Sequence, residues 1–198
     1  MKRILAVLLL AALSIPAFAQ SPARIRGTVQ SIDNLTLTVK SRTGETVTIK
    51  LAEKYVVAGV APASLADVTT GKFIGTATLG QKDGALVALE VLIFPDAMRG
   101  ANEGHYPWDL QPESLMTNAT VADVASGSTQ GRVLTLKYKD GEKKVYVPEG
   151  VPIVTFVAAE RSELRPGAHI FCVAQRQSDG TLTAARVNVG LNGLVPPM

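Results

Sequence analysis

Two stretches of the chain decide its fold: GKFIGTATLGQKDGALVALEVLIF (Gly71–Phe94) and GAHIFCVAQRQSDGTLTAARVNVG (Gly167–Gly190). They align without a gap, and eight of the 24 aligned positions are identical, which is too many for chance. Upstream, LTVKSRTGETVTI (Leu37–Ile49) corresponds to LTLKYKDGEKKVYV (Leu134–Val147). The chain therefore contains two copies of one unit, and this repeat defines the domain count better than the length of 198 residues does.

Both copies have the pattern of short β-strands joined by tight turns. Apolar and polar residues alternate over Leu35–Lys40 and again over Leu134–Lys139, which is typical of strands with one buried face. Asp83-Gly84 and Asp140-Gly141 supply the Asp-Gly pairs that two-residue hairpins favour, because both residues can adopt positive φ. The sequence thus predicts an all-β protein.

Each copy reads as five strands with a short helical turn, at residues 63–68 and 159–164, between the third and fourth strands. This order is that of a small five-stranded OB-like barrel, whose closure hides edge strands that would otherwise aggregate. The predicted architecture is a tandem duplication of this barrel. An SH3-like barrel and a β-meander are the alternatives.

The predicted organisation has five segments. They are a signal peptide at 1–19, the first barrel repeat at 20–96, an inter-repeat linker at 97–117, the second barrel repeat at 118–190 and a flexible tail at 191–198.

The N-terminus predicts export. Lys2 and Arg3 precede an apolar run from Ile4 to Leu13, and the small-residue triplet that begins at Ala17 follows it, which is the pattern of a cleavable signal peptide. We therefore expect a periplasmic protein. No later apolar run approaches the ~20 residues of a membrane span, so we do not expect it to be embedded in the membrane.

Charge argues against nucleic acid as a partner. The chain has 20 Lys and Arg against 17 Asp and Glu, and two of the basic residues belong to the signal peptide. The remaining basic residues are scattered among acids, whereas a nucleic-acid-binding protein needs a concentrated basic surface. The single cysteine, Cys172, lies in an apolar stretch and is expected to be a buried thiol.

The linker contains the residues most typical of a binding site. The cluster His105, Tyr106, Trp108 and Asp109 includes the only tryptophan of the chain, and an unconstrained spacer would consist of Gly, Ser, Pro and charged residues instead. A loop longer than about 12–15 residues is usually functional or disordered. We predict these four residues to be the recognition surface. In the alternative, Trp108 and Leu110 plug a groove between the two barrels.

A metal site is a second hypothesis for the linker. His105, Glu103 and Asp109 would form a nitrogen and oxygen ligand set, whereas Met98, Met116 and His105 would form a softer set suited to copper. No two His or Cys have ligand spacing, and no catalytic motif is present. We assign no catalytic residues and do not expect an enzyme. A hydrolase that uses linker carboxylates is the third hypothesis.

The linker also carries a family resemblance. The segment Gly-x-x-x-Gly-His-Tyr-Pro-Trp-Asp-Leu (Gly100–Leu110) and the segment Met-Thr-Asn-Ala-Thr-Val (Met116–Val121) resemble bacterial exported proteins that carry a domain of unknown function with an OB-like barrel. The resemblance covers most of the chain after the signal peptide and implies no established activity. Some members are labelled metal ABC transporter permease, which supports the metal hypothesis, but a permease needs several membrane spans.

The sequence thus favours an exported periplasmic binding or accessory module. Its recognition surface would be the linker, and its partner would be a periplasmic protein or a small molecule. A periplasmic metal-binding protein is the alternative function.

Cleavage after Ala19 is expected to leave Gln20 as the first residue of the exported protein, because Ala17 and Ala19 are the small residues that signal peptidase requires. N-terminal sequencing of protein from the periplasmic fraction checks this. Chains that begin at Met1 in most of that material would contradict export.

Overall fold

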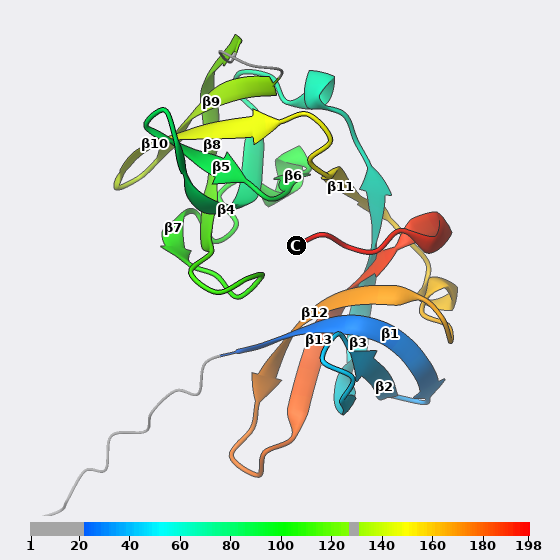
Figure 1. Ribbon diagram of the computed structural model, residues 1–198. Helices are drawn as coiled ribbons and strands as arrows, with labels where there is room; N and C mark the ends of the chain where they lie inside the picture. Colours follow the sequence, from blue (N-terminus) through cyan, green and yellow to red (C-terminus); the bar gives the residue numbers. More distant parts are fainter. Residues whose placement is uncertain (1–21, 127–130) are drawn as a thin grey trace, which may run out of the picture.

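The computed structural model describes residues 22–126 and 131–198 (Figure 1). The signal peptide expected at 1–19 and its cleavage site lie outside the described residues. The described chain forms β-strands and four short 3-10 turns and no α-helix, so the predicted all-β class is confirmed. Figure 1 shows two lobes, one above the other, with the C-terminal segment running between them.

The lower lobe in Figure 1 is a closed five-stranded ring, called here the first barrel. β1 pairs with β2 and β12, β2 pairs with β3, and β12 pairs with β13. A parallel pairing of β3 with β13 closes the ring. Its strands are β1 (Ala23–Asp33), β2 (Thr36–Ser41), β3 (Thr46–Pro62), β12 (His169–Arg176) and β13 (Leu182–Gly190).

The upper lobe, called the second barrel, repeats this pattern strand for strand. β8 pairs with β9 and β4, β9 with β10, and β4 with β5, and a parallel pairing of β10 with β5 closes the ring. A ring closed by a parallel pair is not a β-meander. The strands are β4 (Phe73–Lys82), β5 (Ala85–Ala88), β8 (Leu115–Ser126), β9 (Gly131–Tyr138) and β10 (Gly141–Pro148).

Each barrel contains strands from both copies of the repeat. Three strands of the first copy close with the last two strands of the second copy, and the converse holds for the second barrel. The ranges 20–96 and 118–190 therefore describe the sequence repeat but not the two hydrogen-bonded barrels. The physical reason is that two copies of one unit offer the same pairing edges, so local sequence does not say which copy closes which ring.

Strands outside the two rings join them. β3 extends beyond the first barrel and pairs antiparallel with β11 (Ile153–Ala158), and β11 pairs in parallel with β6 (Val91–Ile93). β7 (Gly104–Pro107) adds to the outer edge of β8. The short turns are η1 (Leu65–Asp67), η2 (Asp96–Met98), η3 (Arg161–Glu163) and η4 (Leu191–Gly193). η1 and η3 lie where the sequence predicts helical turns.

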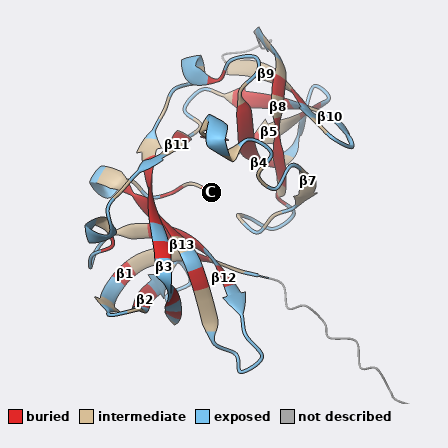
Figure 2. Cartoon of the chain, turned by 180° about the vertical axis from the view of Figure 1, so that it is seen from behind, coloured by how far each residue is buried: buried red, intermediate tan, exposed pale blue. Residues whose placement is uncertain are grey.

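Three apolar cores follow from this arrangement. One fills each barrel, and a third lies between the barrels around Val60, Phe94 and Phe171. Figure 2 shows buried residues along the strands and exposed residues in the connecting loops. Cys172 belongs to the core of the first barrel, where burial raises the pKa of its thiol to about 12, so the expectation of a buried cysteine is confirmed.

The two predicted Asp-Gly turns differ. Asp83 and Gly84 have φ of 51° and 76°, as a two-residue hairpin of this kind requires. Gly141 instead pairs with Tyr138 as the first residue of β10, so the turn there consists of Lys139 and Asp140. The prediction of positive φ at Gly141 is wrong because the loop begins one residue earlier.

The C-terminal residues, expected to form a flexible tail at 191–198, are packed instead. Met198 is 2% exposed and lies in the core between the barrels. Arg26 Nε donates a hydrogen bond to the Met198 backbone oxygen at 2.7 Å, and a terminal nitrogen of Arg42 donates to the Pro196 carbonyl at 2.8 Å. The last residues of a domain are often poorly ordered, but these contacts hold this segment in place. In the described part of the chain, no helix is long and apolar enough to cross a membrane.

A cut in the exposed loop at 111–113 is expected to leave the two halves associated. Both barrels are closed by strands from the two sides of this loop, so the hydrogen bonds and cores that hold the halves together persist after cleavage. Size-exclusion chromatography after cleavage at a protease site placed in this loop checks the prediction. Fragments that separate in native buffer would contradict the exchanged pairing, because separate barrels would come apart after the same cut.

Candidate functional site

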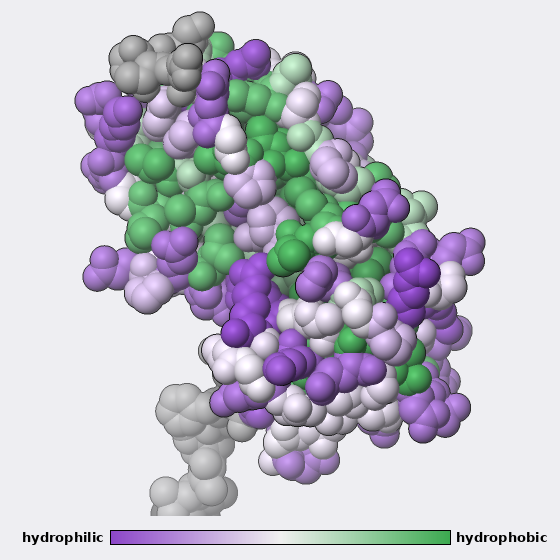
Figure 3. Space-filling view, turned by 45° about the vertical axis from the view of Figure 1, so that its right-hand side comes forward, coloured by the Kyte–Doolittle hydropathy of each residue, from purple (hydrophilic) through white to green (hydrophobic). Residues whose placement is uncertain are grey.

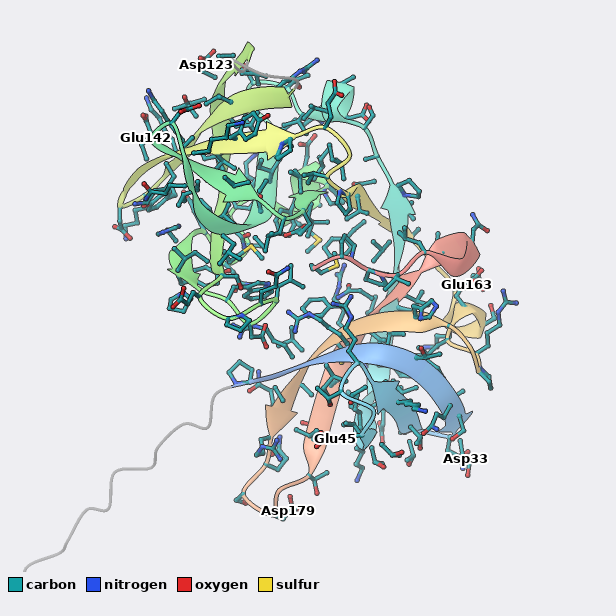
Figure 4. The ribbon with its side chains drawn as sticks, viewed as in Figure 1. Asp33, Glu45, Asp123, Glu142, Glu163 and Asp179 are labelled. Atoms are coloured by element: carbon teal, nitrogen blue, oxygen red, sulfur yellow. The ribbon has the colours of Figure 1, made fainter. Side chains whose placement is uncertain are left out.

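A cavity of about 160 Å³ lies between the two barrels. Its walls come from β4, β6, β8, β11, β12 and β13, from the linker segment with η2 and β7, and from the C-terminal segment. Figure 4 shows sulfur atoms between the lobes, where methionines of these segments converge. The cavity is therefore built from both copies of the repeat and from the connection between them.

Aromatic rings and thioethers dominate the apolar part of the wall. Five of the nine described aromatic residues line the cavity, and so do all three described methionines. Rings give flat apolar surface, whereas methionine side chains adapt to the shape of an occupant. These residues are Phe94, Tyr106, Trp108, Phe156 and Phe171, with Met98, Met116 and Met198.

Three polar atoms in the wall have no hydrogen-bond partner. Glu90 Oε2, Trp108 Nε1 and Asn118 Oδ1 are the buried side-chain nitrogen and oxygen atoms of the described residues that are left unpaired, and all three residues line this cavity. Leaving a buried polar group unpaired costs about 1–3 kcal/mol, so native structures rarely tolerate it without a reason. Their collection around one cavity marks it as the candidate binding site.

Glu90 is a buried carboxyl in the irregular segment between β5 and β6. Its Oε1 accepts a hydrogen bond from the Ala77 amide at 2.8 Å, while its backbone carbonyl accepts one from the Thr76 hydroxyl at 2.6 Å. Burial raises the pKa of Glu90 to about 8, so the carboxyl is mostly protonated at neutral pH and Oε2 can act as a donor. By contrast, the six carboxylates labelled in Figure 4 lie at the outside of the lobes.

Asn118, on β8, has an amide whose orientation is fixed by its neighbours. Its Nδ2 donates to the Ala101 carbonyl and to the Tyr106 hydroxyl, both at 3.1 Å, so Oδ1 is the atom left to accept. A Cβ at Gly75 would lie 2.5 Å from Oδ1. The missing side chain at Gly75 therefore makes the room that the amide oxygen occupies.

Trp108 is held from two sides. Its backbone N–H donates to the Ser114 carbonyl at 2.8 Å, which closes the loop after β7. The Arg24 guanidinium lies 4.1 Å from the centre of the indole ring, and the Phe171 ring centre lies at 6.4 Å. These contacts fix the ring in the wall of the cavity while its N–H has no partner.

Arg186, on β13, brings a positive charge to the cavity. Its Nε donates to Asn188 Oδ1 at 2.9 Å, one terminal nitrogen lies 3.8 Å from Met98 Sδ, and its guanidinium carbon lies 4.9 Å from the centre of the Phe156 ring. Partial burial lowers the pKa of Arg186. No carboxylate of the described residues lies within ion-pair distance of this guanidinium.

Of the four predicted recognition residues, the structure places two in the cavity wall. Tyr106 and Trp108 line it, and His105 does not. His105 and Tyr106 are neighbours on β7, and successive residues of a strand face opposite sides. His105 accordingly lies against the second barrel, where its Nδ1 is 2.8 Å from the Thr117 hydroxyl and its ring stacks on Tyr138.

The predicted nitrogen and oxygen metal ligands are divided between two places. Glu103 lies on the second barrel, as His105 does, and accepts a hydrogen bond from the Lys139 amide at 3.0 Å. Burial, and secondarily the charge of Lys143, lowers the pKa of His105. Asp109 lies on the first barrel, where it pairs with arginines of β1. In the described ranges, no group of three or more His, Cys, Asp or Glu is placed to hold a metal ion.

Asp109 is tied to the first barrel by two arginines of β1. Its Oδ1 lies 2.8 Å from an Arg26 nitrogen and 3.9 Å from an Arg24 nitrogen. Asp109 thus anchors the linker next to Trp108 instead of lining the cavity. Of the two residues proposed to plug the groove between the barrels, Trp108 packs against the core there, and Leu110 faces the arginine-rich surface beside it.

The predicted softer ligands are also separated. Met98 and Met116 both line the cavity, together with Met198, but His105 lies outside it. The guanidinium of Arg186 is the polar neighbour of the Met98 sulfur. A positive charge at this place opposes the binding of a metal cation.

Sequence reasoning missed Glu90, Asn118 and Arg186. One signal could have found two of them, because Glu90 and Arg186 are aligned with each other in the repeat and are ionisable residues flanked by apolar ones on both sides. Two further aligned pairs, Gly75 with Phe171 and Leu92 with Asn188, also line the cavity. Asn118 belongs to the Met-Thr-Asn-Ala-Thr-Val segment, whose sequence does not show that its amide is buried.

Comparison with protein-family models, with curated proteins and with solved structures finds no match. The family resemblance of Gly100–Leu110 and Met116–Val121 therefore stays a prediction. The geometry of the cavity is the basis for the function proposed below.

Glu90→Gln is expected to remove a pH-dependent loss of stability. Because the pKa of Glu90 is about 8 in the folded chain against an ordinary value of 4.5, the folded state keeps a proton that the unfolded state releases. The stabilisation is full below the unfolded pKa and is lost as pH rises through the folded pKa, with a slope of at most about 1.4 kcal/mol per pH unit.

Urea unfolding of the natural chain and the variant across this pH window measures the difference. Glu53→Gln, which changes an exposed carboxylate of β3, is the control and should leave the slope unchanged. Equal pH dependence of the natural chain and Glu90→Gln would show that Glu90 ionises normally in the folded protein.

Proposed function

We propose that this protein is an exported, periplasmic binding protein that holds a small organic molecule between its two barrels. The single observation that supports the proposal most strongly is that Glu90 Oε2, Trp108 Nε1 and Asn118 Oδ1 are all buried, unpaired and located at one cavity. Export rests on residues 1–19, and binding rests on the cavity.

An organic molecule suits this cavity better than water does. The volume of about 160 Å³ has room for several water molecules, and each buried water needs two to four polar partners. Apolar and aromatic side chains form most of the wall and cannot supply so many. An engineered apolar cavity of about 150 Å³ in another protein stays dry and binds benzene, so one ring is an appropriate size for the occupant.

The linker takes part in recognition in this proposal. It contributes the Tyr106 and Trp108 rings, the Met98 side chain and the Ala101 methyl group to the wall. β7 of the linker pairs with β8 of the second barrel, and the Trp108 ring contacts the Phe171 ring of the first barrel, so these groups lie between the two barrels. The predicted recognition surface is thus refined from the whole His-Tyr-Pro-Trp-Asp cluster to the side chains that reach the cavity.

The cavity also has a route from solvent. Asn102 in the linker is exposed and Val173 on β12 is 41% exposed, and both residues line the cavity. Figure 3 shows one face of the molecule on which apolar side chains of the upper lobe reach the junction with the lower lobe, bordered there by strongly hydrophilic groups. A ligand can therefore enter at this junction without unfolding of either barrel.

Filling the cavity is expected to abolish binding of ring-sized probes. Toluene, benzyl alcohol, benzoate and benzylamine are suitable probes, because each has one ring and a different polar group. At least one should bind saturably to the natural chain and shift the single indole N–H resonance of Trp108. Ala101→Phe places a ring in the cavity and should lower the affinity at least about tenfold, corresponding to the loss of one or two kcal/mol of contacts.

Ala97→Phe is the matched control, because Ala97 is exposed in η2 and does not line the cavity. It should bind the probes as the natural chain does. If all four probes fail to bind the natural chain, or if Ala101→Phe binds them unchanged, the cavity is not the binding site.

A further inference from the structure

We propose that the ligand of the inter-barrel cavity is a small carboxylate with a ring-sized apolar body, whose carboxylate pairs with Arg186. This assignment rests on the proposed binding function. It adds the chemical class of the ligand, and it follows from the charges and the unpaired hydrogen-bonding groups around the cavity.

The positive charge of the Arg186 guanidinium favours an anionic ligand. The guanidinium is partly buried, and in the cavity wall it contacts the Asn188 amide oxygen, the Met98 sulfur and the Phe156 ring, none of which neutralises its charge. Charges that leave bulk water are normally paired. Arg24 and Arg26, whose guanidinium groups lie over the Trp108 ring, already share Asp109. Arg186 is the cavity-lining cation without a carboxylate partner among the described residues.

The unpaired groups agree with an anionic ligand. Trp108 Nε1 can only donate a hydrogen bond, and Glu90 Oε2 donates when the carboxyl is protonated. Burial favours that protonated form, because it raises the pKa of Glu90. A ligand carboxylate accepts from such donors, and charge-assisted hydrogen bonds are the stronger kind.

A cationic ligand fits less well. Glu90 would have to lose its proton to pair with an ammonium group, and the Arg186 guanidinium would repel that group. Asn118 Oδ1 is the acceptor at the site. It would accept from a hydroxyl or amino group on the body of a carboxylate ligand, so a hydroxy-acid satisfies one group more than a plain acid does.

The decisive experiment compares three probes that have the same ring and a similar length. Benzoate, benzyl alcohol and benzylamine carry a negative, a neutral and a positive group. Isothermal titration of the natural chain at neutral pH should show benzoate binding on the order of tenfold more tightly than either of the others, the gain expected from one charge-assisted contact. The Trp108 indole N–H resonance should shift most with benzoate.

Arg186→Gln removes the charge and should reduce benzoate affinity to that of benzyl alcohol, while benzyl alcohol affinity stays within about twofold of that of the natural chain. Arg186→Lys keeps the charge and should retain part of the preference for benzoate. Arg161→Gln is the matched control, because Arg161 also stacks on a ring, that of Tyr55 at 4.1 Å, but lies outside the cavity. It should leave all three affinities unchanged.

The possible outcomes test the proposed ligand class and the proposed binding function separately. If benzyl alcohol or benzylamine binds as tightly as benzoate, or if Arg186→Gln keeps the benzoate preference, the carboxylate assignment fails and the cavity function stands. If toluene, benzyl alcohol, benzoate and benzylamine all fail to bind, both fail. Benzoate preference that depends on Arg186 supports both.

Discussion

The closure of each barrel by strands from the other half of the chain is the constraint on which the whole structure depends. β3 can complete its ring only with β13, and β10 only with β5, so neither half buries its core alone. The extended end of β3 and its pairing with β11 then bring the two rings together. The space between the rings, with its own apolar core, is a direct result of this exchange.

The same constraint explains why the linker and the C-terminal segment are ordered. An exchanged pair of barrels has a groove between its lobes, and these two segments bury apolar side chains in it. Ion pairs of Asp109 with Arg24 and Arg26 hold the linker on β1. A hydrogen bond from Arg26 to the Met198 carbonyl holds the C-terminal segment there as well. Packing in the groove is incomplete, and the remaining volume is the cavity.

The local structure could be predicted from the sequence, but the pairing of the strands could not. Alternation over Leu35–Lys40 and Leu134–Lys139 places both strands correctly, because burial on one face determines that pattern. Which copy closes which barrel depends on long-range geometry that two similar sequences do not encode locally. At the site, the residue type of Trp108 indicated a binding role, whereas the shared location of Glu90 and Arg186 at one cavity follows only from the fold.

Glu90 and Arg186 occupy aligned positions of the two copies, and both face one cavity. In a symmetric pair of identical single units, such positions would carry the same residue, so two acids or two guanidinium groups would confront each other across the axis. Joining both units in one chain lifts this restriction, because each position can then diverge separately. Equivalent positions of a symmetric homodimer could not place a carboxyl group and a guanidinium group in one pocket, whereas the two copies within this chain do so.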